Sequence, residues 1–138
     1  MTMMSDTKKS INVVAALIEQ DGKVFAAQRA YGELKGKWEL PGGKIENGET
    51  PQEALKREIK EELDTEIEVG GFFMHIDYEY PTFFLHMDVF RATPLKGRLQ
   101  IEAGIHSDEG FFAISELIRL DWCPADCLVL EKLTFDRP

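Results

Sequence analysis

Residues 50–63 limit the fold of this chain more than any other segment, because they read as a helix with one apolar face. Thr50 can cap the helix, Pro51 suits its first position, and Glu53 completes a capping box. Apolar side chains then follow at helical spacing, at Leu55, Ile59 and Leu63. An apolar stripe of this kind must pack against another layer, so the rest of the chain has to supply a partner surface.

Strand-like segments supply that surface. Apolar and β-branched runs occupy residues 11–19, 24–29, 66–74, 78–80, 83–91 and 110–113. The Asp21-Gly22 dipeptide between the first two runs is typical of a two-residue hairpin. A short helix capped by Ser115 and a last helix after Pro124 complete the pattern. Strands and helices in this order predict one α/β domain with a mixed sheet and few helices.

The size and charge of the chain exclude several classes of function. With 138 residues and no linker, we expect residues 1–9 to be a disordered end and residues 10–138 to form a single domain. The net charge of −9 opposes binding to polymeric nucleic acid or to an anionic membrane. The start lacks an apolar signal, and the longest apolar run, residues 13–18, is far too short to span a bilayer. We therefore expect a cytoplasmic protein, either a monomer or a homodimer.

Three glutamates form the most informative cluster in the sequence. Around the predicted helix, Glu58, Glu61 and Glu62 share one side, which borders the apolar stripe. One interpretation is a solvated acidic face, in which Arg57 pairs with Glu61. The alternative is a site for Mg²⁺ or Mn²⁺, which prefer carboxylate, carbonyl and water ligands. The Pro-Gly-Gly loop at residues 41–43 favours the metal site, because glycines allow a ligand to approach the backbone closely.

The spacing around these glutamates resembles the Nudix box, G-x5-E-x7-R-E-U-x-E-E-x-G-U, where U is apolar. Gly43, Glu49 and the run 57–62 match it, whereas Asp64 and Thr65 replace its final glycine and apolar residue. Further segments look like the MutT branch of this family, at residues 13–16, 28–29, 38–46 and 122–126. The resemblance implies the Nudix fold, a mixed β-sheet sandwiched between α-helices. It also implies hydrolysis of a nucleoside diphosphate that is linked to a variable group.

The same resemblance assigns roles to the acidic residues. It implies that Glu58 and Glu62 bind the metal directly, with the Gly42 carbonyl completing the shell. Glu61 is either a further ligand or the base that orients water. The choice between these roles stays open, because carboxylates that share a metal also share their titration. Many relatives have one more acidic residue before the last strand, and this chain offers Glu102, Asp108 and Glu109 there.

The resemblance further implies that Arg57 pairs with Glu49. In that arrangement the arginine holds the loop carboxylate in place and supports the metal ligands from behind. The alternative is that Arg57 pairs along its own helix, with Glu53 or Glu61.

A second set of residues is expected to bind the substrate. Arg29 and Lys44 are the best-placed cations for phosphates, and Glu39 and Leu40 lie in the matched segment between them. Asp126 follows a Pro-Ala turn, where related 8-oxo-guanine hydrolases place an Asn or Asp that bonds the base. The alternative is that Asp126 caps the last helix. Some relatives have an aromatic residue in place of Leu40, and four aromatics are either substitutes for it or core residues: Tyr78, Tyr80, Phe83 and Phe84.

The resemblance implies Mg²⁺-dependent hydrolysis of a nucleoside triphosphate, such as 8-oxo-dGTP or CTP, to a nucleoside monophosphate and pyrophosphate. A nucleotide-sugar or ADP-ribose hydrolase is the alternative within the family. A catalytically silent Nudix module that binds a nucleotide and regulates a partner is the alternative outside the enzymes. The three intact glutamates argue against a silent module, because such a domain has no need to hold mutually repelling carboxylates together.

Overall fold

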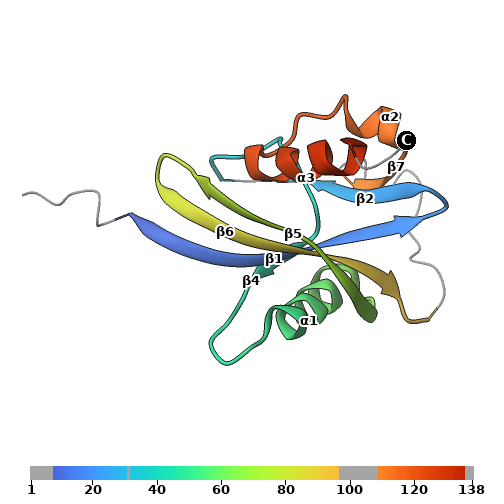
Figure 1. Cartoon of the computed structure of the whole chain (residues 1–138), viewed down its shortest axis with the longest axis horizontal. Helices are drawn as coiled ribbons and strands as arrows, with labels where there is room; N and C mark the ends of the chain where they lie inside the picture. The colour runs from blue at the N-terminus through green and yellow to red at the C-terminus, as the bar shows by residue number, and fades with distance from the viewer. Residues whose placement is uncertain (1–7, 31, 97–108, 136–138) are drawn as a thin grey trace, which may run out of the picture.

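In the computed structural model, residues 8–30, 32–96 and 109–135 are described, and they form a long twisted sheet with helices on both sides (Figure 1). The strands are β1 (Lys9–Gln20), β2 (Lys23–Gln28), β3 (Trp38–Glu39), β4 (Gly42–Lys44), β5 (Ile67–Glu79), β6 (Phe83–Pro94) and β7 (Glu109–Phe112). The helices are α1 (Pro51–Leu63), α2 (Ile114–Leu117) and α3 (Pro124–Phe135). Among the described residues, none of these helices is long and apolar enough to cross a membrane.

Strand β1 joins the two halves of the sheet. Its residues 9–18 pair in parallel with β6, and its last two residues pair with the start of β2. β4 pairs antiparallel with β1, and β5 pairs antiparallel with β6, so the sheet is mixed, as the sequence predicts. The predicted hairpin between β1 and β2 is confirmed. Asp21 and Gly22 both have positive φ, 54° and 76°, as a tight two-residue turn of this kind requires.

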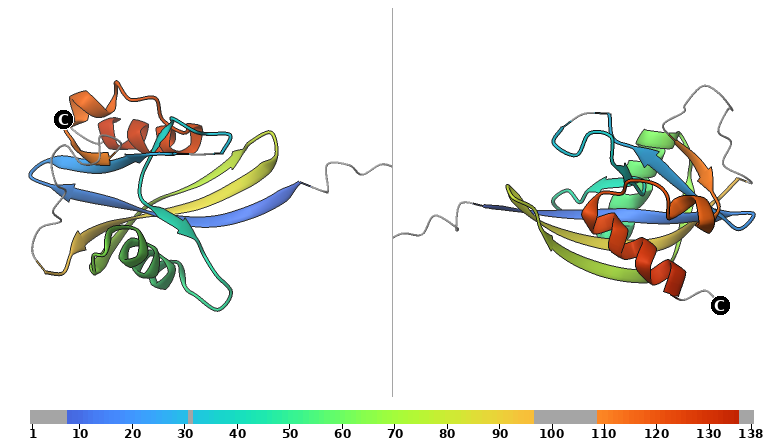
Figure 2. Two further views of the ribbon diagram at one scale, coloured as in Figure 1. Left: turned by 180° about the vertical axis from the view of Figure 1, so that it is seen from behind. Right: turned by 90° about the horizontal axis from the view of Figure 1, so that it is seen from above.

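Alternation along β1 divides the core into two layers. Val14 and Ala16 face α1 and belong to the same buried cluster as Ile59. Leu17 faces the other way and belongs to the cluster that includes Val129 of α3. Both views in Figure 2 show α1 on one side of the sheet and α3 on the other. The predicted arrangement of a mixed sheet between helices is therefore confirmed.

The sequence misplaced some element boundaries. β5 is one continuous strand, whereas two strands were predicted at 66–74 and 78–80. His75 and Asp77 interrupt the apolar pattern because their side chains are exposed, while the backbone pairing with β6 continues through them. β1 begins two residues before the predicted position 11, and the first seven residues of the predicted disordered end lie outside the described part of the chain.

The prediction that Ser115 caps the short helix is also wrong. Helix α2 begins at Ile114, so its N-cap is Ala113. Alanine has no capping side chain, but the N–H group of Ala113 donates to the Glu116 carboxylate at 2.8 Å. This half of a capping box is enough to mark the helix start.

Both ends of α1 follow from its sequence. The Thr50 hydroxyl accepts from the Glu53 N–H at 3.1 Å, and the Glu53 carboxylate accepts from the Thr50 N–H at 2.9 Å, which is the predicted capping box. Asp64 ends the helix in the left-handed conformation, with φ 50° and ψ 41°. An aspartate adopts this conformation less easily than glycine, and its charge lies at the negative end of the helix dipole.

We expect Asp64→Gly to raise the free energy of unfolding by about 1 kcal/mol, since glycine adopts the left-handed conformation without a Cβ penalty. The change also removes the contact of Asp64 with Lys60 at 3.1 Å, but a pair this exposed contributes little. Urea unfolding gives the comparison, and Asp64→Asn separates the loss of charge from the conformational gain. A lower midpoint in the glycine variant would contradict the interpretation.

Candidate active site

A cavity of about 310 Å³ opens on the α3 side of the sheet, beside the Pro-Gly-Gly segment. Its walls come from β1, β6, the β3–β4 segment, the last turn of α1 and the start of α3. The lining residues with charged or hydrogen-bonding side chains are Arg29, Glu39, Lys44, Glu62, Tyr80, Cys123 and Asp126. All five residues predicted to bind substrate lie in this lining, since Leu40 contributes as well. The fold therefore brings together side chains that are almost 100 positions apart.

Glu58 and Glu62 reach from α1 to the two glycines of β4. The Gly42 N–H donates to the Glu62 carboxylate at 3.2 Å. At Gly43, an added Cβ atom would lie 2.3 Å from the Glu58 carboxyl carbon, and at Gly42 it would lie 2.0 Å from the Val14 carbonyl oxygen. Side chains at these two positions would push the carboxylates and the strand away, so the close approach depends on glycine.

The charged form of Glu62 is destabilised by its surroundings. Loss of hydration in the pocket and repulsion from Glu58 raise the pKa of Glu62 to about 7, although the residue as a whole is solvent-exposed. Glu39 and Glu109 add to the repulsion, and the hydrogen bond from Gly42 offsets only part of it. A divalent cation relieves such repulsion, and carboxylate oxygens are donors that suit Mg²⁺ or Mn²⁺. The residues present therefore fit the metal that the box implies.

Glu61 shares Nη1 of Arg57 with Glu58. Its side chain is 60% exposed, and its carboxylate is 3.4 Å from Nη1 of Arg57. Among the acidic residues offered for a further ligand, Glu109 begins β7 and is near enough to raise the pKa of Glu62. Glu102 and Asp108 lie outside the described residues. The role of Glu61 as ligand or base stays a prediction.

Arg57 connects the box residues. Its Nε and Nη2 atoms donate to the two oxygens of Glu49 at 2.7 and 2.9 Å, which makes a bidentate pair. Nη1 donates to Glu58 at 2.9 Å, and Nη2 also donates to the Lys44 carbonyl at 3.0 Å. The hydrogen bonds from Arg57 lower the pKa of Glu49 to about 2, and the two glutamates raise the pKa of Arg57 above its usual value. The contact along the helix to Glu61 is present too, but it is longer.

We expect Arg57→Lys to lower kcat/KM about 10- to 100-fold and to raise the half-saturating Mg²⁺ concentration. A lysine cannot make the planar two-bond contact with Glu49 or hold Glu58 at the same time. Activity measured across a Mg²⁺ titration tests this, with Arg91→Lys as the matched control, because Arg91 pairs with Glu19 and is not part of the cavity lining. Equal Mg²⁺ dependence in all three proteins would exclude a supporting role for Arg57.

The two cations of the cavity have different surroundings. Nη1 of Arg29 lies 3.3 Å from Glu39, and both side chains are partly exposed. Burial raises the pKa of Glu39, and the Arg29 charge offsets part of this. Lys44 is exposed at the end of β4. Both cations are thus in the cavity and in reach of solvent, as phosphate-binding groups need to be, and this role stays a prediction.

Asp126 is a buried carboxylate that lines the cavity. α3 begins at Pro124, so Asp126 lies inside its first turn and the alternative of an N-cap is wrong. One carboxylate oxygen accepts from the Leu40 N–H at 2.9 Å. Burial, which outweighs this hydrogen bond, raises the pKa of Asp126 to about 7. A buried carboxylate with so little compensation is costly for the fold, which is typical of a functional group.

Two further residues line this cavity: Tyr80, for which the sequence left a pocket and a core position open, and Cys123, to which it assigned no role. Tyr80 is a buried lining residue whose hydroxyl accepts from the Ala125 N–H at 3.1 Å, and its ring stacks on Phe83 at 4.7 Å. The thiol of Cys123 also lines the cavity, and burial raises its pKa to about 12. The aromatic run in the sequence gave a signal for Tyr80 and Phe83, although core and pocket positions look alike at strand spacing. No local pattern indicated Cys123.

Comparison with known proteins supports one family. A model of the NUDIX domain matches residues 8–138. The CTP pyrophosphohydrolase of Escherichia coli strain K12 is 37% identical over 124 residues, which are 89% of this chain and 90% of that protein. The 8-oxo-dGTP diphosphatase of Proteus vulgaris is 32% identical over 99 residues, 70% of this chain and 88% of that protein. The crystal structure of a MutT NUDIX hydrolase from Burkholderia pseudomallei has a TM-score of 0.78 at 26% identity, with 91% of this chain and 99% of that chain covered.

These similarities extend over nearly the whole chain and agree with the box residues that converge at β4 and α1. Nudix hydrolases generally use a divalent metal, which is consistent with the repelling carboxylates of Glu58 and Glu62. The chain therefore belongs to the Nudix family and is a MutT-like Nudix hydrolase.

Proposed function

We propose that this hydrolase converts a nucleoside triphosphate, such as 8-oxo-dGTP, CTP or a related nucleotide, to a nucleoside monophosphate and pyrophosphate with the help of Mg²⁺. The observation that carries the proposal is one cavity that combines the Glu62 carboxylate, the cations Arg29 and Lys44, and the buried Asp126. These groups are needed to bind a metal, the phosphates and the nucleobase of the substrate. The names of two relatives, a CTP pyrophosphohydrolase and an 8-oxo-dGTP diphosphatase, point to the same substrate class.

Release of pyrophosphate requires cleavage of the bridge between the α- and β-phosphorus atoms. The oxygen of water bonds to one phosphorus, the bridging oxygen leaves with the other, and a proton of the water passes to a base. A bound divalent ion supplies charge neutralisation and a lower pKa for the water. Glu58 and Glu62, with the Gly42 carbonyl, would hold that ion. Glu61 is then a further ligand or the base that accepts the proton.

The remaining groups of the cavity orient the substrate. Arg29 and Lys44 pair with phosphate oxygens, which lowers the charge on the group that water attacks. An ionised Asp126 accepts hydrogen bonds only, and its contact with the Leu40 N–H leaves acceptor capacity for an N–H group of the base. The amino group of cytosine and the N–H edge of a guanine both provide such donors. The rings of Tyr80 and Phe83 and the side chain of Leu40 form apolar walls beside it.

A substrate panel tests the proposal. We expect pyrophosphate release from 8-oxo-dGTP, dGTP, CTP or dCTP that depends on added Mg²⁺ and stops with EDTA. ADP-ribose, which releases no pyrophosphate, is assayed by its monophosphate products and represents the alternative substrate class. Preference for ADP-ribose or a nucleotide sugar would overturn the triphosphate assignment. Nucleotide binding without turnover of any compound would indicate a silent module.

We also propose that the enzyme acts in the cytoplasm on free nucleotides, as a monomer or homodimer. The net charge of −9 disfavours polymeric nucleic acid as a partner, because the two would repel each other. Both cysteines are free thiols, which is consistent with a reducing compartment.

A further inference from the structure

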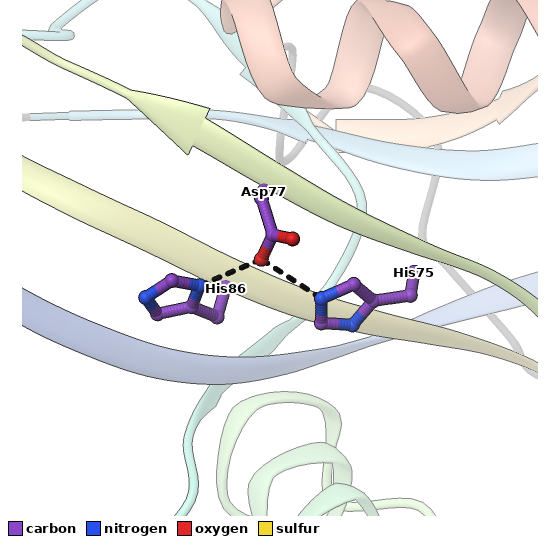
Figure 3. A group of neighbouring side chains, drawn as sticks. All are labelled: His75, Asp77 and His86. Carbon is purple, nitrogen blue, oxygen red and sulfur yellow. Dashed lines mark hydrogen bonds and ion pairs between the residues drawn. The ribbon is translucent and has the colours of Figure 1, made fainter.

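Two histidines and two aspartates gather on an exposed part of the β5–β6 pair, outside the active-site cavity. Asp77 lies directly opposite His86 in the antiparallel register, and His75 lies opposite Asp88. Side chains at alternate positions of a strand share a face, and directly paired residues touch across the strands. The register therefore places all four side chains on one face of the sheet. Figure 3 shows His75 and His86 on either side of the Asp77 carboxylate.

This face is not the face of the cavity. Along β6, Leu85 and Met87 line the active-site cavity, whereas His86 and Asp88 alternate with them and point to the opposite side of the sheet. The opposite side is the one that α1 covers further along the strands, and in Figure 3 the helix lies beside the cluster without covering it. The side chains of His75, Asp77 and His86 are 46%, 65% and 36% exposed, so an ion can reach them from solvent.

The contacts inside the cluster converge on one oxygen. Oδ1 of Asp77 is 2.8 Å from Nε2 of His75 and 2.6 Å from Nδ1 of His86. On the far side of the His75 ring, Nδ1 is 2.7 Å from the Asp88 carboxylate. One nitrogen of each ring and one aspartate oxygen all lie within 4.8 Å of one another. Asp88 fixes the orientation of the His75 ring, with Nε2 directed at Asp77.

We propose that His75, Asp77 and His86 form a second metal site, which binds a divalent transition-metal ion of the zinc class, with Asp88 orienting the His75 ring. Two imidazole nitrogens and one carboxylate oxygen are ligands that Zn²⁺ binds and that Mg²⁺ does not favour. A carboxylate behind a ligating histidine is the usual partner that sets the ring orientation at such sites. The site would leave one position of a tetrahedral ion open to water.

Metal binding requires the side chains of the cluster to move. Zinc–ligand bonds of about 2.0–2.1 Å in a tetrahedron place neighbouring ligand atoms about 3.3 Å apart. The contacts of Asp77 with His75 and His86 must therefore lengthen by about 0.5 and 0.7 Å as the ion replaces the hydrogen-bonding protons. The ligand atoms, which lie up to 4.8 Å apart, must draw together to about the same 3.3 Å. Exposed side chains on paired strands can make this movement by rotation. The bound ion would join β5 to β6, so it should raise the melting temperature as well as bind.

The experiment uses full-length protein without a polyhistidine tag, in excess Mg²⁺, which occupies hard oxygen sites. We expect calorimetric titration with Zn²⁺ to show one equivalent bound, and Co²⁺ to give the visible absorption of a nitrogen- and oxygen-ligated ion. His75→Gln and His86→Gln should each weaken binding by more than tenfold, and Asp88→Asn should weaken it by about 10- to 100-fold. Glu62→Gln should leave it unchanged. His106→Gln is the matched control, because it removes the third histidine of the chain and no residue of the cluster.

A second measurement needs no variant. In NMR spectra of the unaltered protein, the imidazole signals of His75 and His86 should shift together as Zn²⁺ is added. Binding that persists in the double variant His75→Gln/His86→Gln, or that disappears in Glu62→Gln, would overturn the proposal and place the ion elsewhere. The absence of any Zn²⁺-dependent shift in these imidazoles would also overturn it. None of these results depends on the nucleotide that the enzyme hydrolyses.

Discussion

Glu62→Gln should reduce kcat by about 10³-fold or more, which corresponds to about 4 kcal/mol of lost transition-state stabilisation. The substitution keeps the size and the contact with the Gly42 N–H, but it removes the negative charge that we propose holds the metal. Because that charge is repelled by Glu58 in the metal-free protein, its removal should not lower the melting temperature. Pyrophosphate release at saturating nucleotide and Mg²⁺ gives the measurement.

Three further variants make this test specific. Glu58→Gln should lower kcat as Glu62→Gln does, because both carboxylates lie at the glycines of β4. Glu61→Gln distinguishes a base from a ligand: a base variant keeps its affinity for Mn²⁺ and loses kcat, whereas a ligand variant loses both. Glu68→Gln, an exposed glutamate on β5, should have no effect and controls for a change of net charge. Activity of Glu62→Gln within tenfold of the unaltered enzyme would exclude the proposed metal role.

Asp126→Asn should stabilise the protein at pH 8 by roughly 2–4 kcal/mol. This range follows from the raised pKa of Asp126, because each unit of pKa difference between the folded and unfolded states corresponds to about 1.4 kcal/mol. Burial raises the pKa of Asp126 to about 7, so the folded state favours the protonated acid more strongly than the unfolded state does. The stability that the protonated group contributes is fully present below about pH 4. It is lost as the pH rises through about 7. An asparagine is neutral throughout, and its amide oxygen can still accept from the Leu40 N–H.

Urea unfolding at several pH values measures this difference. The gain from Asp126→Asn should be small near pH 4, grow between about pH 4 and 7, and level off above that range. Asp121→Asn provides the control, because Asp121 is an exposed aspartate just before α3 whose contact is with Lys37. A stability gain that does not depend on pH would mean that Asp126 is not held in a costly charged state.

The same residue should affect substrate choice. Asp126→Ala removes the acceptor, so kcat/KM should fall by about 10²- to 10³-fold for the nucleotide whose N–H groups it bonds, and less for the others. The result to examine is the ranking across the panel, because loss of the Leu40 contact alone would lower all activities together. An unchanged ranking would remove Asp126 from base recognition and leave it as a structural group.

The acidic half of the site could be predicted from the sequence, because its determinants are local. Capping by Thr50 and Glu53 fixes the start of α1, and helical spacing then places Glu58 and Glu62 on one side, four residues apart. The two glycines before the helix indicate a close approach of backbone and ligand. The hairpin at Asp21-Gly22 was equally predictable, since the turn chemistry depends on two adjacent residues. Glu61 is the exception: its contact with Arg57 follows from helical spacing, but its role as ligand or base does not.

Only the tertiary structure decided the roles that depend on distant partners. The local pattern around Asp126 allowed either a helix cap or a pocket residue. The start of α3 at Pro124 excludes the cap, and the packed layers place Asp126 in the cavity lining, in contact with Leu40, 86 positions away. The cluster of His75, Asp77 and His86 likewise exists only through the register of β5 on β6. Spacing along one helix or one turn is set by local backbone geometry, which a short stretch of sequence is enough to determine. Burial and pairing between segments are set by how the layers pack, and a short stretch of sequence does not contain that information.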